Sequence, residues 1–417
     1  MNTQTLPRIR ESLFQSGTAK VIRVLRGAVI GVLIARHLGP ENFGLYSFAL
    51  SLVTMASVII PMGADQVLLK YLTADDSDEN QLLSTGMKIR SYGLIVSFLL
   101  LATFLYFRPQ SWEVLCLIVA FCIGEVAKIL LVKGFALEAG QRFKEMAKAH
   151  IIACVSGAVI ALLGIIYNWP IWSFAIAVSV DAWIFALLLW RVPGKQATQE
   201  MSYVPKIGHV FRESLPFLIP AAGIGIYMQV DLVMIEQIRG LREAGLYATS
   251  VRTYEVGILG PMVFMSVFAP RLYAATSEEL QERFRQAAVW MFRIGVVTIA
   301  AGLLFGLPLF PVIYSERFND AAPAFACLLP TIMVFGTGLL TSALIVRSSK
   351  GTVYMIGNCI AAGLNIGLNF ALIPTLGMYG AIIATFASFL VSALLPITVV
   401  RETRWALITL IRSLRLF

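Results

Sequence analysis

The chain has 417 residues, of which 58% are hydrophobic and only 14% are charged. Soluble domains carry about 25% charged residues, so this composition excludes a soluble globular protein and indicates an integral membrane protein. The net charge of +9 fits Lys and Arg residues at cytoplasmic helix ends and contact with anionic membrane lipids; no nucleic acid is expected as a partner.

Apolar segments of spanning length recur along the chain and are joined mostly by short turns. Because unpaired strands cannot cross lipid, the sequence predicts an all-α membrane protein with twelve transmembrane helices. They lie at about residues 12–38, 42–72, 82–107, 112–136, 148–167, 170–191, 212–238, 243–272, 287–314, 321–346, 352–374 and 378–400.

The first segment holds three cations, Lys20, Arg23 and Arg26, on one helical face. Its uncharged part, residues 27–35, is too short to cross a bilayer, so the charged part must enter the membrane as well. Each such cation facing lipid would cost about 2.5 to 3.5 kcal/mol. We therefore expect either a cation-lined substrate site, or a shallow Lys20 with Arg23 and Arg26 paired to carboxylates of other helices.

Four acidic residues and two further cations lie within later apolar segments. Glu125 is one helical turn from Lys128, and Arg252 is one turn from Glu255, so each pair can neutralise itself. Asp181 and Asp231 have no cation three or four residues away on their own helices. Turnover against a gradient requires a group whose charge changes inside the membrane, and Asp231 is the first candidate for it, with H⁺ or Na⁺ as the ion.

The longest cytoplasmic connection, residues 193–210, separates two six-helix bundles at 1–192 and 211–400. The motif Gly-x4-Gly-Leu-Tyr follows the first helix of each half, once with Gly44 and again with Gly245. A repeat offset by six helices keeps its orientation, so the sequence predicts parallel repeats around a central cavity. Residues 401–417 form an amphipathic cytoplasmic tail helix that is expected to lie on the inner leaflet.

Lys and Arg residues gather at the predicted cytoplasmic ends, so both termini are expected in the cytoplasm. The five cysteines lie in apolar runs without metal-ligand spacing, and no metal or cofactor is expected.

Three motifs resemble the polysaccharide transporter family, the O-antigen flippases of the multidrug, oligosaccharidyl-lipid and polysaccharide exporter superfamily. They are ARHLGPENFGLY at 35–46, VDLVMI at 230–235 followed by EAGLY at 243–247, and NxxxNxxLIPxxGxxGAxxAT from Asn365 to Thr385. The resemblance implies two bundles, alternating access and a bacterial inner-membrane location. The implied substrate is an undecaprenyl-pyrophosphate-linked oligosaccharide of the O-antigen type, moved from the cytoplasmic to the periplasmic leaflet.

Guanidinium groups bind pyrophosphate oxygens through two-pronged, charge-assisted hydrogen bonds. Arg23, Arg26 and Arg252 are therefore the first candidates for substrate binding, with Lys20 and Lys128 second. The ion-coupling candidates are Asp231, Asp181, Glu125 and Glu255. Other polysaccharide-assembly proteins are candidate partners.

Two alternatives stay open. A multidrug exporter of the same superfamily would use this architecture, although the excess of deep cations over acids favours an anionic substrate. A membrane polysaccharide polymerase would need catalytic groups on a substantial outer loop. The predicted outer turns are short, and the three histidines lie far apart without a nucleophile nearby, so no enzyme activity is expected.

Overall fold

The computed structural model describes residues 5–73, 78–194, 205–348 and 350–414; for residues 5–26, 28, 216, 219–221 and 224 it describes the backbone only. All regular elements in these ranges are helices, which confirms the predicted all-α class. The chain forms two compact units: unit 1 holds residues 1–26 and 45–229, and unit 2 holds residues 27–44 and 230–417. The linker residues 195–204 lie outside the described residues.

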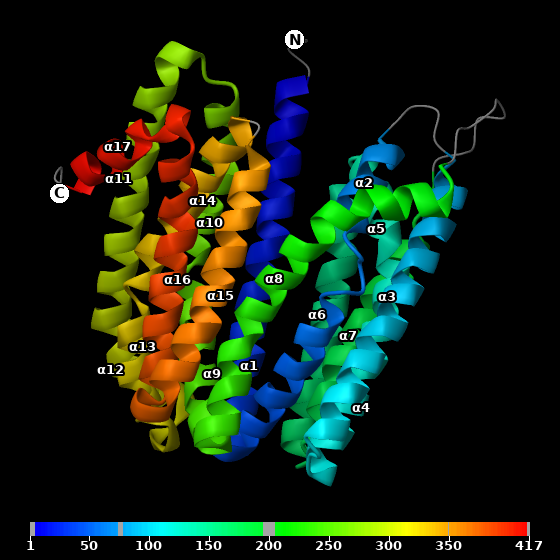
Figure 1. Cartoon of the computed structure of the whole chain (residues 1–417). Coiled ribbons are helices and arrows are strands. Elements are labelled where there is room, and N and C mark those ends of the chain that lie inside the picture. Colours follow the sequence, from blue (N-terminus) through cyan, green and yellow to red (C-terminus); the bar gives the residue numbers. More distant parts are fainter. Residues whose placement is uncertain (1–4, 74–77, 195–204, 349, 415–417) are drawn as a thin grey trace. The chain divides into compact units, whose positions relative to one another are not determined.

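Unit 1 is an elongated bundle in which α7 packs against both α4 and α6 (Figure 1). Two helices, α1 (Thr5–Ser57) and α8 (Ile207–Arg239), contribute to both units. The other elements of unit 1 are α2 (Ala64–Leu72), α3 (Glu79–Phe107), α4 (Trp112–Val126), the 3₁₀ segment η1 (Ala127–Val132), α5 (Lys133–Ala139), α6 (Phe143–Ile166) and α7 (Trp172–Trp190).

Unit 2 is built around the antiparallel pair α15 and α16, and α14 packs against α16. Besides its parts of α1 and α8, the described part of unit 2 contains twelve elements, given in chain order with their bounds. They are α9 (Leu241–Gly257), α10 (Leu259–Tyr273), α11 (Ser277–Ala301), the π segment η2 (Gly302–Gly306), α12 (Leu307–Tyr314), η3 (Glu316–Phe318), α13 (Ala321–Leu328), α14 (Thr331–Arg347), α15 (Gly351–Leu376), α16 (Met378–Val399), η4 (Arg401–Thr403) and α17 (Trp405–Leu414).

Within the described ranges, nine helical segments are long and apolar enough to cross a membrane, and the protein is a multi-pass membrane protein. All nine coincide with predicted spans. The other three predicted spans fall on α1 with α2 and on α8, which include residues described by backbone only. The number twelve therefore stays a prediction.

The predicted repeat has a matching backbone at its two turns. Gly39 has φ 75° and ψ 173°, and Gly240 has φ 91° and ψ 174°. This region is open to glycine and strained for residues with a Cβ, so glycine is required at both places. Pro40 directly follows Gly39, at the kink that divides α1 into two helical parts.

The second glycine of each motif, Gly44 or Gly245, packs against the backbone of the other motif within unit 2. A Cβ on Gly44 would overlap the carbonyl oxygen of Leu241, and a Cβ on Gly245 would overlap that of Pro40. Because the repeat aligns Gly44 with Gly245 and Pro40 with Leu241, the contact is reciprocal, as two-fold pseudosymmetry requires. Small residues allow backbones to approach this closely where helices pack in membranes.

Replacing Gly245 by alanine should therefore destabilise unit 2. The obstacle is backbone, which cannot rotate away like a side chain, so we expect a loss of about 2 kcal/mol or more, as in overpacked cores. Unfolding in detergent, followed by circular dichroism, measures the change. Gly363→Ala is the matched control, since a Cβ there meets nothing within 4 Å. Equal stability of the two variants would contradict the prediction.

The second predicted span, 42–72, is interrupted, which corrects the continuous helix expected from the sequence. The break covers residues 58–63, between α1 and α2, and contains Pro61 next to Met62 and Gly63 with φ of 48° and 72°. Proline disfavours helical conformation in the residue before it, and the two left-handed residues stop the helix. The fourth predicted span stays helical throughout, with the 3₁₀ segment η1 between α4 and α5.

Side chains satisfy backbone carbonyls that these irregular segments leave available. Arg90 Nη1 donates to the carbonyl of Lys128 at 2.5 Å, and the Trp190 indole donates to that of Leu130 at 2.8 Å. Unpaired carbonyls at membrane depth are costly, so these donors allow the 3₁₀ segment to persist.

The two units divide the chain inside α8, at Gln229, whereas the sequence places the division in residues 193–210. The first part of α8 packs on the broken span of unit 1. Gly63 lies against the backbone of Ser214, and Lys70 pairs with Glu213 at 3.5 Å. The predicted bundle limits of 1–192 and 211–400 remain a proposal.

Candidate functional site

A buried polar site in unit 2 surrounds Asp231, which is 7% exposed. Its carboxylate accepts three hydrogen bonds from neutral side chains on three other helices. Asn369 Nδ2 donates at 2.6 Å to Oδ1, while the hydroxyls of Thr385 and Tyr247 donate at 2.6 and 3.0 Å to Oδ2. A fourth residue, Asn365, accepts a hydrogen bond of 3.0 Å from Asn369 Nδ2.

The local sequence explains why these groups meet. Asn365 and Asn369 are four residues apart and therefore share one face of α15. That face packs on α16, which carries Thr385, because the chain reverses at Gly377 with φ 58°. Glu243 of α9 holds this reversal by accepting the N–H of Met378 at 2.6 Å. The motifs at 230–235, 243–247 and 365–385 thus converge on one carboxylate.

Two amide atoms of the site are buried without a hydrogen-bond partner: Asn365 Nδ2 and Asn369 Oδ1. Both asparagines are fully buried. The oxygen and nitrogen of an asparagine side-chain amide exchange places when the amide rotates by 180°. Such a rotation of Asn369 would direct its Oδ1 at Asp231 and at the Asn365 oxygen. The site would then present carboxylate, amide and hydroxyl oxygens to one point.

The predicted substrate cations fall into two groups. Lys20, Arg23 and Arg26 lie on the helical backbone of α1, and their side chains lie outside the described part of the structure. Lys128 Nζ is 2.6 Å from Glu125 and 2.9 Å from the Ser57 hydroxyl, which confirms the ion pair expected from their spacing. Arg252 pairs with Glu255 at 3.4 Å, and the two side chains are 35% and 41% exposed.

Asp181, the second candidate for ion coupling, is 9% exposed in α7 of unit 1. Unit 1 also contains an ion pair between a buried arginine and a half-buried aspartate that the sequence analysis does not predict. Arg90, 5% exposed, contacts Asp65 at 2.8 Å. Arg90 lies inside the predicted span 82–107, where an unpaired charge is energetically costly, so its position could have indicated an ion pair.

Chemically, the Asp231 site can hold a proton or a small hard cation. Among the described side chains, the hydrogen-bond donors to this buried carboxylate are all neutral and give it no counter-charge, so neutralisation by an ion is favourable. Oxygen donors of these types suit hard cations. Among the described residues no group of three or more His, Cys, Asp or Glu side chains could hold a metal ion.

Solved structures with this fold are transporters. The inward closed conformation of the lipid II flippase MurJ has a TM-score of 0.73 at 15% identity, covering 95% of this chain and 90% of that one. The MATE multidrug transporter DinF-BH gives 0.68 at 16% identity, covering 97% and 98%. A MOP superfamily transporter from Pyrococcus furiosus gives 0.63 at 16% identity, covering 96% of each chain. The chain therefore shares its fold with these three transporters.

The family described as "Polysaccharide biosynthesis protein" matches residues 9–276, and the chain belongs to that family. The succinoglycan biosynthesis transport protein ExoT of Rhizobium meliloti is 24% identical over 321 residues, or 74% of this chain. The match spans 62% of the length of ExoT. This family membership confirms the resemblance seen in the sequence motifs.

Proposed function

We propose that the protein is a flippase that moves an undecaprenyl-pyrophosphate-linked oligosaccharide across the bacterial inner membrane, from the cytoplasmic to the periplasmic leaflet. Membership of the polysaccharide biosynthesis family, with a MOP-type fold, supports a lipid-linked saccharide as cargo. The transport cycle is alternating access with both termini in the cytoplasm, and an O-antigen-type repeat unit is the proposed cargo.

The observation that carries the transport mechanism is the Asp231 site. Its carboxylate is buried among four neutral polar side chains where two of the three family motifs meet, the one at 230–247 and the one at 365–385. The described hydrogen-bond partners of this carboxylate are all neutral, and a buried charge with only neutral partners is costly in a membrane, so the site gains stability when it takes up H⁺ or Na⁺. Binding or release of that ion shifts the equilibrium between the transporter states. The size of the shift is set by the difference between the ion's affinities for those states.

Substrate binding is assigned to Arg23, Arg26 and Arg252, with Lys20 and Lys128 as secondary groups. The partial exposure of the Arg252–Glu255 and Lys128–Glu125 pairs supports this assignment, because a pyrophosphate can compete for a cation that water also reaches. Glu125 and Glu255 then hold these cations between transport events rather than coupling ions.

Reconstitution tests the function directly. Proteoliposomes would carry a fluorescent polyprenyl-pyrophosphate saccharide, and an impermeant quencher would report its movement between leaflets. We expect protein-dependent movement that a Na⁺ or proton gradient accelerates. The matched comparison uses a fluorescent organic cation in the same vesicles. Transport of the cation without movement of the lipid-linked saccharide would overturn the proposal in favour of multidrug export.

A further inference from the structure

The helix α17 is a docked part of unit 2 and not a free tail. Ala406 and Leu410 are buried in a hydrophobic cluster with residues of α11, and the rings of Trp405 and Phe284 meet edge to face at 5.2 Å. Arg404 Nε donates to the carbonyl of Thr398 at 2.8 Å, near the end of α16. Figure 1 shows α17 lying across the ends of α11 and α16 rather than along them.

The rest of the α17 surface divides into two flanks. At about 100° per residue, Leu407, Ile411 and Leu414 occupy an arc on one side of the docked face, while Arg404 and Arg412 occupy the other exposed arc. Ile411 and Leu414 are 48% and 49% exposed, and Ile408, 55% exposed, lies within the basic arc, midway between Arg404 and Arg412. An apolar flank beside a basic flank is the pattern of a helix that lies in a membrane interface.

Two neighbouring features place α17 at the level of lipid headgroups. It follows α16, a membrane-spanning helix, after only the short η4 segment. On α11, Trp290 is 52% exposed, and the Arg293 guanidinium lies 5.3 Å from its ring centre. Exposed tryptophan beside arginine marks a membrane boundary. Phe284, which α17 contacts, is six residues before Trp290, or roughly 9 Å along a helix.

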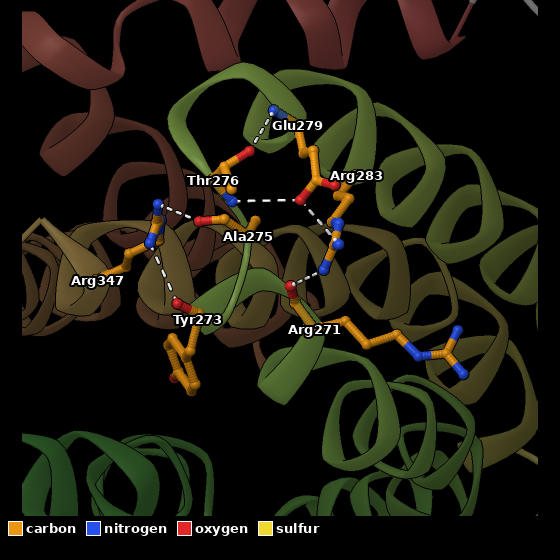
Figure 2. Close-up of polar contacts among 7 residues, drawn as sticks. All are labelled: Arg271, Tyr273, Ala275, Thr276, Glu279, Arg283 and Arg347. Carbon is orange, nitrogen blue, oxygen red and sulfur yellow. Dashed lines mark hydrogen bonds and ion pairs between the residues drawn. The ribbon is translucent and has the colours of Figure 1, made fainter. Parts of the chain in front are cut away.

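Arginine side chains hold the turn before α11, the helix on which α17 packs. Figure 2 shows Arg347 donating to the carbonyls of Tyr273 and Ala275, at 3.2 and 2.7 Å. Arg283 donates to the carbonyl of Arg271 at 2.8 Å and also pairs with Glu279 at 2.9 Å. Arginine side chains on the last carbonyls of a helix hold its end in place.

From this arrangement we propose that α17 is an in-plane membrane helix whose basic flank binds anionic phospholipid headgroups. The charge supports one occupant: exposed Arg401, Arg404 and Arg412 outnumber Glu402 on η4 and α17, so an anionic leaflet is favoured over a zwitterionic one. The inference does not depend on the transported substrate.

Depth measurements on the full-length protein test the in-plane position. Single spin labels at positions 411, 414 and 412, in a variant without the five native cysteines, would be compared in lipid nanodiscs with a label at position 285. Arg285 is exposed on the same end of α11 and pairs with Glu282. Oxygen concentrates in the bilayer interior, whereas a water-soluble nickel complex stays in water. We expect the labels at 411 and 414 to collide more with oxygen than with nickel, and the label at 412 to show the intermediate ratio of the headgroup level. Labels at 411 and 414 as open to nickel as the label at 285 would overturn the proposal.

A second measurement tests the lipid preference. A fluorophore at position 414 would be quenched by spin-labelled phosphatidylglycerol or phosphatidylcholine at equal mole fraction. We expect stronger quenching by phosphatidylglycerol, with the preference reduced by up to about fivefold in Arg412→Gln and retained in Arg412→Lys. Arg285→Gln is the matched control and should leave the preference unchanged. Equal quenching by both lipids, or the same loss in Arg285→Gln, would overturn the proposal.

Discussion

Asp231→Asn is expected to abolish the dependence of transport on an ion gradient. Asparagine is almost the same size and can keep the hydrogen bonds from Thr385 and Tyr247, so the fold around the site should persist. It carries no charge and cannot be neutralised by H⁺ or Na⁺, so the ion would no longer distinguish between transporter states. The measurement is flippase rate in proteoliposomes with and without each gradient.

Asp181→Asn is the matched comparison, since Asp181 is the other buried aspartate of the candidate set and lies in unit 1. We expect this variant to keep gradient dependence. Unchanged gradient dependence in Asp231→Asn would reject Asp231 as the coupling residue, and loss in Asp181→Asn alone would move the role to unit 1. Direct binding of radioactive Na⁺ to purified protein gives a readout independent of transport and should fall in Asp231→Asn if Na⁺ is the ion.

The second large effect is expected at Arg23 and Arg26. Charge-assisted hydrogen bonds to phosphate are worth about 1.5 to 3 kcal/mol each, so alanine at either position should lower the flipping rate roughly 10- to 100-fold. Lysine should restore only part of the rate, because it keeps the charge and loses the two-pronged geometry. Proteoliposome flipping of the labelled lipid-linked saccharide measures both changes.

Arg285→Ala controls for the removal of a guanidinium that lies outside the proposed site, and it should flip at the wild-type rate. Membrane insertion of every variant is checked by extraction and gel filtration. Wild-type flipping by both alanine variants would remove helix α1 from the substrate site, and equal rescue by lysine and arginine would argue against bidentate phosphate binding.

The sequence predicts correctly those parts of the fold that depend on a single physical constraint. Spans could be located because lipid demands about 20 apolar residues for each crossing. The turns at Gly39 and Gly240 could be located because their backbone conformation requires glycine. The break at 58–63 was missed, since Pro61 and Gly63 lie in an apolar run and prolines also occur in continuous membrane helices.

The candidate site could be predicted only in part. Local spacing singles out Asp181 and Asp231, whose own helices provide no neutralising cation nearby, and Asp231 ranks first because it lies in the VDLVMI motif. Its partners Tyr247, Asn369 and Thr385 come from other helices, and their motifs are visible in the sequence without any indication that they meet.

The sequence by itself determined that this protein spans the membrane with helices, that the motif Gly-x4-Gly-Leu-Tyr recurs at an offset of 201 residues, and that charged side chains lie within apolar segments. These properties depend on composition and on periodicity along one helix. The tertiary structure alone decided which polar groups surround Asp231, that the Gly44 and Gly245 backbones touch, and that α17 rests on α11. Such contacts join residues far apart in the chain, and they depend on how helices pack, which local periodicity does not specify.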